Sequence, residues 1–418
     1  MTTDSDTGTG MFRDTADAAE LLAEYAAGSS FFFASPRGSM LARGVDATVP
    51  KTTCASGRSG LPRRVADFLR HAEEFGRRDP LVVGAVPFDG DLPAHLVLPS
   101  EVVRAQPLGE SAVVAPAAES AGGDYELRQV PAPGEYERAV ERVLKRLRSA
   151  ELSKVVLARS LELSTADRID PARMLRNLAA ADPGGYTYAV DLPRRGADGS
   201  RDNFGPQPEL ARTLLGASPE LLVSRHGTQV RANPMAGSRP RSDDPAEDRC
   251  RAAELLESDK DLREHAAVVE AVADALRPYC TELVVPERPS VRSTAAMWHL
   301  ATEVTGELAD PATSSLQLAV AMHPTPAVCG TPPEPARQAI AEAEPFERGF
   351  YTGMVGWCDA AGDGEWVVTI RCAEIEDAAL RLYAGAGIVE GSDPAEELAE
   401  TSAKFRTALS AMGWSGAL

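Results

Sequence analysis

Residues 351–404 read YTGMVGWCDAAGDGEWVVTIRCAEIEDAALRLYAGAGIVEGSDPAEELAETSAK, and the pattern in this stretch decides the fold. Three short apolar runs separated by polar turns predict a three-stranded meander over residues 351–358, 365–375 and 379–384. Side chains alternate along the middle run, which places Trp366 on a core-facing side and Arg371 on the opposite side.

Two helices are predicted from their capping residues. Asp393 and Pro394 supply an N-cap and a first-turn proline for a helix after the meander. Its predicted apolar stripe comprises Leu398, Ser402, Phe405 and Leu409. Earlier in the chain Ser258 caps a helix predicted over residues 259–277, which Pro278 ends. The predicted buried face of that helix comprises Val268, Val269, Val272, Ala273 and Leu276.

Strand patterns also occur before these helices. An apolar run predicts a buried strand over residues 30–34. Two further strands, over residues 214–223 and 228–232, flank a hairpin turn at residues 226–227. Because strands occur both before and after helices, the sequence predicts an α/β or α+β fold.

The composition is that of a globular protein. The chain has 418 residues, of which 44% are hydrophobic, 25% charged and 6% aromatic, which excludes a collagenous, coiled-coil or wholly disordered chain. Its 62 acidic and 43 basic residues give a net charge of -19, so nucleic acid is not expected as a partner. A small anionic substrate therefore needs local cations or a bound metal.

Cysteine usage and hydropathy point to the cytoplasm. The six cysteines form no C-x-x-C pair and are expected to be reduced and mostly buried. The N-terminus has no basic segment followed by an apolar one, and no apolar stretch approaches 18 residues. We therefore expect a cytoplasmic protein without a membrane partner.

Two of the predicted helices carry pairs of acids three residues apart. The pairs are Asp261 with Glu264 and Glu397 with Glu400. Two such faces opposed would offer oxygen ligands to a hard cation such as Mg²⁺. Solvated helix faces explain the pattern equally, and Lys404 stands in position for an exposed ion pair with Glu400.

Other polar residues are candidates for chemistry, each with a structural alternative. Lys154 begins an apolar run, where desolvation would favour a base, although most such lysines only extend to solvent. Burial of Glu220 would favour a general acid, although a turn acid after proline is common. Residues 385–387 (GAG) offer backbone N–H groups or form only a turn, and His299 in apolar surroundings suits a core histidine.

Taken together, several segments resemble the chorismate-utilising enzyme family. The matching segments are residues 152–160, 216–222, 234–238 (PMAGS), 258–265, 298–301 (WHLA), 323–330 (HPTPAVCG), 353–372 and 383–404. The resemblance implies one large α/β sandwich of two antiparallel sheets with helices outside and the active site between the sheets. We expect a single catalytic domain over residues 15–418, with core motifs over 150–410, after a disordered tail over 1–14. Residues 194–208 form a longer segment than is usual in the family.

The resemblance also implies an activity: Mg²⁺-dependent conversion of chorismate to isochorismate, by water addition at C2 and loss of the C4 hydroxyl. Lys154 matches the base and Glu220 the acid. The implied metal ligands are Glu264 and Glu400, with Asp261 and Glu397 acting through water. The implied substrate-binding positions are Arg371, Lys404, the Gly385 backbone, His299 and Ala327. A monomer is expected from the family.

Few residues separate the reactions within this family. Lys154 resembles the water-using members, because anthranilate synthases typically have glutamine there, and Ala236 stands where aminodeoxychorismate synthases have a lysine nucleophile. A salicylate synthase, which also eliminates pyruvate, remains the alternative reaction, and a non-catalytic chorismate-binding relative is the alternative of another class. A siderophore pathway is favoured over menaquinone synthesis.

Overall fold

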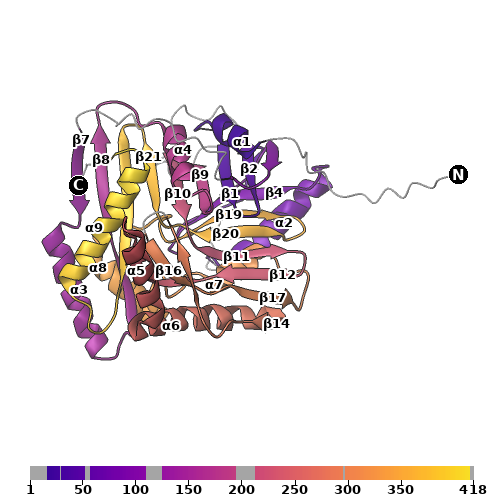
Figure 1. The fold of residues 1–418 in the computed structure, drawn as a ribbon. Coiled ribbons are helices and arrows are strands. Elements are labelled where there is room, and N and C mark those ends of the chain that lie inside the picture. The colour runs from indigo at the N-terminus through magenta and orange to yellow at the C-terminus, as the bar shows by residue number, and fades with distance from the viewer. Residues whose placement is uncertain are drawn as a thin grey trace.

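Two large antiparallel sheets form the centre of the molecule in the computed structural model, which describes residues 17–28, 30–51, 57–109, 125–193, 212–294 and 297–414. The strands of one sheet run vertically in Figure 1 and those of the other run horizontally, so the two sheets cross. A 10-stranded sheet contains, in spatial order, β18 (Gly330–Thr331), β8 (Lys154–Thr165), β22 (Ala379–Ile388), β21 (Cys372–Glu376), β10 (Arg212–Ser218), β9 (Tyr186–Leu192), β1 (Ser30–Ser35), β2 (Gly38–Arg43) and β6 (Glu101–Ala105), with β7 (Tyr125–Val130) on β8.

The second sheet has nine strands among the described residues. In spatial order they are β14 (Cys280–Val284), β17 (Val304–Leu308), β12 (Gln229–Asn233), β11 (Leu221–His226), β20 (Gly364–Val368), β19 (Met354–Asp359), β4 (Leu81–Val86), β5 (His95–Leu98) and β3 (Ala47–Thr48). A third, small sheet comprises β13 (Met235–Pro240), β16 (Met297–Ala301) and β15 (Ser290–Ser293).

Helices cover the outer faces of the sheets. They are α1 (Ala18–Glu24), α2 (Leu61–Glu74), α3 (Pro133–Arg148), α4 (Pro171–Ala181), α5 (Pro245–Glu257), α6 (Asp259–Leu276), α7 (Ser315–Met322), α8 (Pro333–Ala343) and α9 (Pro394–Ala411), with a 3₁₀ turn at Arg277–Tyr279. Phe33 and Val190 of the first sheet pack against Val355 and Val367 of the second in one buried cluster. The predicted sandwich with helices outside is therefore confirmed, and the third sheet is an addition to it.

Several predicted elements are confirmed at their ends. The side chain of Ser258 accepts a hydrogen bond from the backbone N–H of Asp261 at the start of α6, and the predicted inner face of α6 is buried. Asp393 caps α9 in the same way. The predicted hairpin between β11 and β12 is present, but its turn lies at Gly227 and Thr228, one residue later than predicted, because His226 still pairs with Gln229.

Two predictions of a single strand were wrong in the same way. In each case the predicted segment forms two strands, and these belong to different sheets. The run over 214–223 breaks at Pro219–Glu220, where the chain passes from β10 to β11. The run over 365–375 breaks at residues 369–371, between β20 and β21, so Arg371 does not lie on a strand face and has a φ of 50°. Trp366 and Val367 are both fully buried, so alternation could not reveal the break.

Two smaller predictions also need correction. The buried face of α9 includes Glu397 and Thr401 as well as Phe405 and Leu409, whereas Leu398 is only partly buried. The turn considered for residues 385–387 is absent, because β22 continues through them to Ile388. The expected tail and the segment over 194–208 lie outside the described residues.

The described cysteines agree with the sequence prediction that most are buried, unpaired thiols. Cys329, Cys358 and Cys372 are buried thiols, whereas Cys250 is exposed, and the described cysteines are all free. Among the described residues, no helix is long and apolar enough to cross a membrane.

Candidate active site

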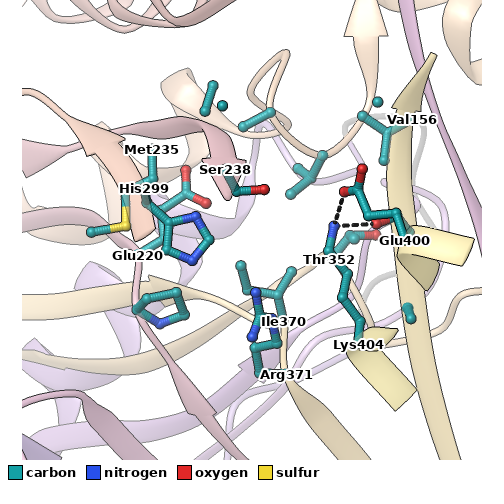
Figure 2. A pocket seen from close by; sticks show the side chains of 18 of the residues that line it. Val156, Glu220, Met235, Ser238, His299, Thr352, Ile370, Arg371, Glu400 and Lys404 are labelled. Atoms are coloured by element: carbon teal, nitrogen blue, oxygen red, sulfur yellow. Dashed lines mark hydrogen bonds and ion pairs between the residues drawn. The ribbon is translucent and has the colours of Figure 1, made fainter. Parts of the chain in front are cut away.

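The chain passes between the two large sheets where β10 leads to β11 and where β20 leads to β21. Both connections line one cavity of about 140 Å³ (Figure 2). Charged residues from five parts of the chain line it: Lys154, Glu220, Glu264, Arg371, Glu400 and Lys404. Lys154 begins β8, and Glu264 is on α6. Glu220 lies between β10 and β11, and Arg371 lies between β20 and β21. Glu400 and Lys404 are on α9. The cavity exists because strands far apart in sequence end at the same place.

Glu220 is buried in this cavity. Its side chain lies beside His299 in Figure 2, on the side opposite Glu400 and Lys404. Burial raises the pKa of the Glu220 carboxyl to about 8, although a backbone hydrogen bond at Met235 and the charge of Lys154 act in the opposite direction. Glu220 therefore holds a proton at neutral pH, as a general acid requires.

Lys154 and Glu264 form one ion pair in the cavity. The Lys154 ammonium donates to Glu264 Oε1 at 2.7 Å, and the two side chains are only 8% and 17% exposed. The pair joins the start of β8 to the first turns of α6. The sequence also allowed Lys154 to extend to solvent and Glu264 to be a solvated acid. Both of these alternatives are wrong.

A second lysine and glutamate form a pair on α9. Lys404 Nζ donates to Glu400 Oε1 at 2.7 Å and to the carbonyl oxygen of Gly385 at 2.8 Å (Figure 2). The charge of Lys404 outweighs burial and lowers the pKa of Glu400. Gly385 therefore contributes its carbonyl group to lysine positioning, and it lines the same cavity.

The remaining predicted substrate-binding residues also line the cavity. Arg371 is enclosed, and burial lowers the pKa of its guanidinium. Burial likewise lowers the pKa of His299 to about 3, so the imidazole is neutral, and its Nε2 has no hydrogen-bond partner among the described residues. Ala327 forms part of the wall. A neutral imidazole with a free nitrogen can bind a substrate hydroxyl or carboxylate.

The carboxylates offer a cation two ligands. Glu264 and Glu400 line the same cavity from different helices, and Mg²⁺ commonly uses one or two protein carboxylates while keeping several waters. The two other predicted acids do not line the cavity. Asp261 binds Arg239 at 3.2 Å, and burial raises the pKa of Glu397 to about 7. Within the described residues no group of three or more acidic, histidine or cysteine side chains is arranged to hold a metal ion.

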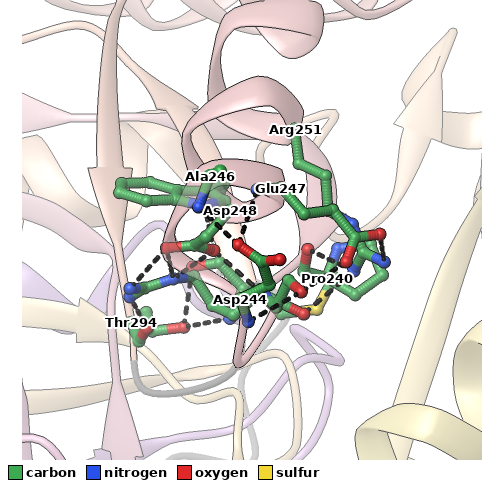
Figure 3. A network of polar contacts seen from close by, with 11 residues as sticks. Pro240, Asp244, Ala246, Glu247, Asp248, Arg251 and Thr294 are labelled. Carbon is green, nitrogen blue, oxygen red and sulfur yellow. Dashed lines mark hydrogen bonds and ion pairs between the residues drawn. The ribbon is translucent and has the colours of Figure 1, made fainter.

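A polar network holds the outer edge of the site (Figure 3). Asp248, on α5, accepts hydrogen bonds from Trp298 Nε1 at 2.8 Å and from Arg241 Nε at 2.9 Å. The guanidinium of Arg241 also stacks over the Trp298 ring at 4.4 Å. Trp298 precedes His299 on β16, so this network fixes the strand that presents the imidazole to the cavity.

Sequence reasoning missed several residues that shape the cavity. A Cβ at Gly387 would lie 3.1 Å from Lys154 Cε and 3.2 Å from Glu264 Oε1, so any larger residue would require that ion pair to shift. The rings of Tyr351 and Tyr383 stack at 4.8 Å in the cavity wall. The GAG pattern at residues 385–387 was the available signal, because paired glycines within a strand indicate a close approach.

A buried ion pair supports the opposite wall. Arg348 Nε donates to Glu344 Oε2 at 2.8 Å, and both side chains are 2% exposed. Arg348 also donates to the carbonyl oxygens of Val156 and Val328, which line the cavity. No sequence motif that we identified signalled this pair.

The chain is similar to known proteins over almost its whole length. Residues 104–413 match the family described as "Chorismate binding enzyme". Isochorismate synthase DhbC of Bacillus subtilis (strain 168) is 54% identical over 396 residues, which are 95% of this chain and 96% of that protein. The vibriobactin-specific isochorismate synthase of Vibrio cholerae is 42% identical over 92% of each chain.

A solved structure has the same arrangement of elements. The crystal structure of a putative 2,3-dihydroxybenzoate-specific isochorismate synthase, DhbC from Bacillus anthracis, matches with a TM-score of 0.87. It is 51% identical, and the match covers 95% of this chain and 100% of that one. Anthranilate synthase component I from Streptococcus pneumoniae TIGR4, at 21% identity and a TM-score of 0.60, shares the fold.

Proposed function

The chain belongs to the chorismate-binding enzyme family, and from this membership we propose that it is an isochorismate synthase that converts chorismate to isochorismate. The observation that carries the proposal is one cavity in which a protonated Glu220 and Lys154 are accompanied by Arg371 and Lys404. Such a cavity offers a proton donor, a candidate base and two cations to a small dicarboxylate. The high identity to isochorismate synthases over the whole chain favours this reaction within the family.

Substrate binding follows from the local cations. Chorismate carries two carboxylates, which a protein of net charge -19 repels at long range, so the cavity itself must supply the attraction. Arg371 binds one carboxylate through its planar guanidinium, and Lys404 adds a second positive charge beside it. The neutral His299 offers its free Nε2 to a ring substituent.

Proton transfers are then assigned to two residues. In its neutral amine form, Lys154 accepts a proton from water as the oxygen of that water bonds to C2 of the ring, so the ammonium paired with Glu264 first loses a proton to solvent. Glu220 donates its proton to the C4 hydroxyl, which leaves as water while the ring double bonds shift. One water enters and one leaves, so isochorismate is an isomer of chorismate.

Mg²⁺ fits this scheme through Glu264 and Glu400. When bound, the ion supplies positive charge that neutralises and orients a substrate carboxylate. Both glutamates are held by lysines in the present structure, so a cation there competes with the ammonium groups of Lys154 and Lys404. Asp261 and Glu397 lie outside the cavity and act only by supporting the two ligands.

The product is assigned to 2,3-dihydroxybenzoate synthesis, as in a catechol siderophore pathway. This assignment rests on the similarity to a protein described as 2,3-dihydroxybenzoate-specific and to a vibriobactin-specific synthase. The active protein is proposed to be a monomer, as the family resemblance implies.

Product analysis tests the proposal. The purified protein is incubated with chorismate and Mg²⁺, with and without EDTA, and the products are separated by liquid chromatography and identified by mass. We expect isochorismate alone, and none with EDTA. Salicylate with pyruvate would identify a salicylate synthase instead, and the absence of turnover would indicate a non-catalytic chorismate-binding protein.

A further inference from the structure

A second cavity lies away from the active site. It has a volume of about 320 Å³ and lies between the first turn of α2 and the chain around β3, β4 and β5. None of its lining residues lines the active-site cavity. Its volume falls within the range of about 300 to 1,000 Å³ that is typical of small-molecule sites.

Three positively charged side chains line this cavity. Lys51, Arg58 and Arg64 line it, and Asp91 is the one carboxylate among the described lining residues. Within the described part of the chain, no ion pair is formed by any of these three cations. The Nε atoms of both arginines are buried without a hydrogen-bond partner there. A buried donor without a partner costs free energy, which a bound acceptor would recover.

Arg58 is fixed in place for binding. Its guanidinium donates to the backbone carbonyl oxygen of Pro87 at 2.5 Å and to that of Phe88, and it contacts Nδ1 of His323 at 2.6 Å. These partners are neutral, because burial lowers the pKa of His323 to about 3. The guanidinium of Arg58 is therefore held in a fixed position by neutral partners, although the charge of Asp89 also acts on it, and this fixed position lowers the cost of ordering it around an anion.

The rest of the cavity is apolar. Val49, Leu61, Val86 and Leu96 contribute buried side chains to its wall. Leu61 is also the first residue of α2, whose N-cap residue Gly60 makes no side-chain capping bond, so the positive end of a 14-residue helix adds to the field. A lining that contains both cations and aliphatic groups suits an amphiphilic anion.

We propose that this cavity is a second binding site, separate from the active site, for a small organic carboxylate with an apolar body. The carboxylate lies against Arg58 and Arg64, with Lys51 at the exposed side, and the apolar body lies against the aliphatic wall. The proposal does not depend on the reaction assigned to the active site, because the two cavities share no lining residue.

The test measures binding of benzoate by titration calorimetry, in EDTA so that no turnover occurs. An Arg371→Gln protein serves as the background, because it removes the active-site guanidinium assigned to a substrate carboxylate and so weakens binding of carboxylates there. We expect benzoate to bind this protein, and benzamide, its neutral analogue, to bind at least about tenfold more weakly. Adding Lys51→Gln and Arg64→Gln should weaken benzoate binding by at least about tenfold.

Arg63→Gln is the matched control, because Arg63 lies on the same helix turn with a side chain that is 91% exposed. It should leave benzoate affinity unchanged, and the Lys51→Gln, Arg64→Gln double variant of the unmodified enzyme should keep chorismate turnover. Displacement of benzoate by chorismate would support the site with the substrate as its occupant, and no displacement would support it with another carboxylate. No benzoate binding, equal binding of benzamide, or full affinity in the double variant would overturn the proposal.

Discussion

Glu220 is the residue whose protonation the mechanism depends on most. Burial raises its pKa to about 8, so the fraction that carries a proton falls as the pH rises through that value. We therefore expect kcat/KM for chorismate to fall on the alkaline side with a midpoint near that pKa. Glu220→Gln should lower kcat by about a hundredfold or more, because a positioned acid typically contributes that much.

The measurement is a pH profile of initial rates for the enzyme and two variants. Glu365→Gln is the control, since Glu365 is another buried carboxyl with a raised pKa but does not line the cavity. Its profile should match that of the unmodified enzyme. An alkaline limb that persists unchanged in the residual activity of Glu220→Gln would assign the titration to another group.

Gly387 gives a steric prediction. An added methyl group would lie 3.1 Å from Lys154 Cε and 3.2 Å from Glu264 Oε1, so it would push the ion pair apart. Gly387→Ala should lower kcat by up to about a hundredfold, because small displacements of catalytic groups cost that much. Steady-state rates measure the loss. Gly184→Ala, where the new Cβ meets nothing within 4 Å, should be fully active, and equal rates for the two variants would refute the steric argument.

At the scale of elements, the small sheet and α5 determine how His299 is presented. Asp248 is 7% exposed and binds both Trp298 and Arg241, and the hydrogen bond from Arg241 is the main cause that lowers the pKa of Asp248 (Figure 3). Asp248→Ala removes both contacts and leaves the Arg241 side chain without its carboxylate. We expect a lower Tm and a fall in kcat/KM of up to about a hundredfold from the displaced strand β16.

The matched control is Glu247→Ala. Glu247 neighbours Asp248 on α5, but its side chain is 53% exposed and its ion pair with Arg251 lies at the surface. Surface pairs typically contribute about 0 to 1 kcal/mol, so Tm and turnover should hardly change. Thermal unfolding and steady-state kinetics compare the two variants. An Asp248→Ala enzyme with normal kcat/KM would show that the network does not position the site.

Elements with strong local signals could be predicted from the sequence, and those set by tertiary contacts could not. Helices α6 and α9 begin where Ser258 and Asp393 supply caps, because capping is a local interaction. The stripe of α9 was misplaced at Glu397, because a buried carboxylate beside a binding site breaks the apolar pattern. The change of sheet at Arg371 was missed because both faces of β20 are buried.

At the scale of the molecule, the site forms because one chain contributes strands to two sheets in turn. Glu220 and Arg371 lie at two of the places where the chain passes from one sheet to the other, and no local pattern marks those places. Individual candidates such as Lys154 remained ambiguous from the residues alone, since burial was unknown. The family resemblance identified their common site, and the structure adds the ion pairs, Gly387 and the second cavity.

The central claim is that this protein adds water to C2 of chorismate with Lys154 as the base. The most direct measurement is turnover in ¹⁸O-enriched water with Mg²⁺, followed by mass spectrometry of the isochorismate formed early in the reaction. We predict one solvent oxygen in each product molecule, at the C2 hydroxyl, and no labelled product from a Lys154→Ala enzyme that still binds chorismate. Isochorismate without the label, or labelled isochorismate formed at the normal rate by Lys154→Ala, would contradict the account.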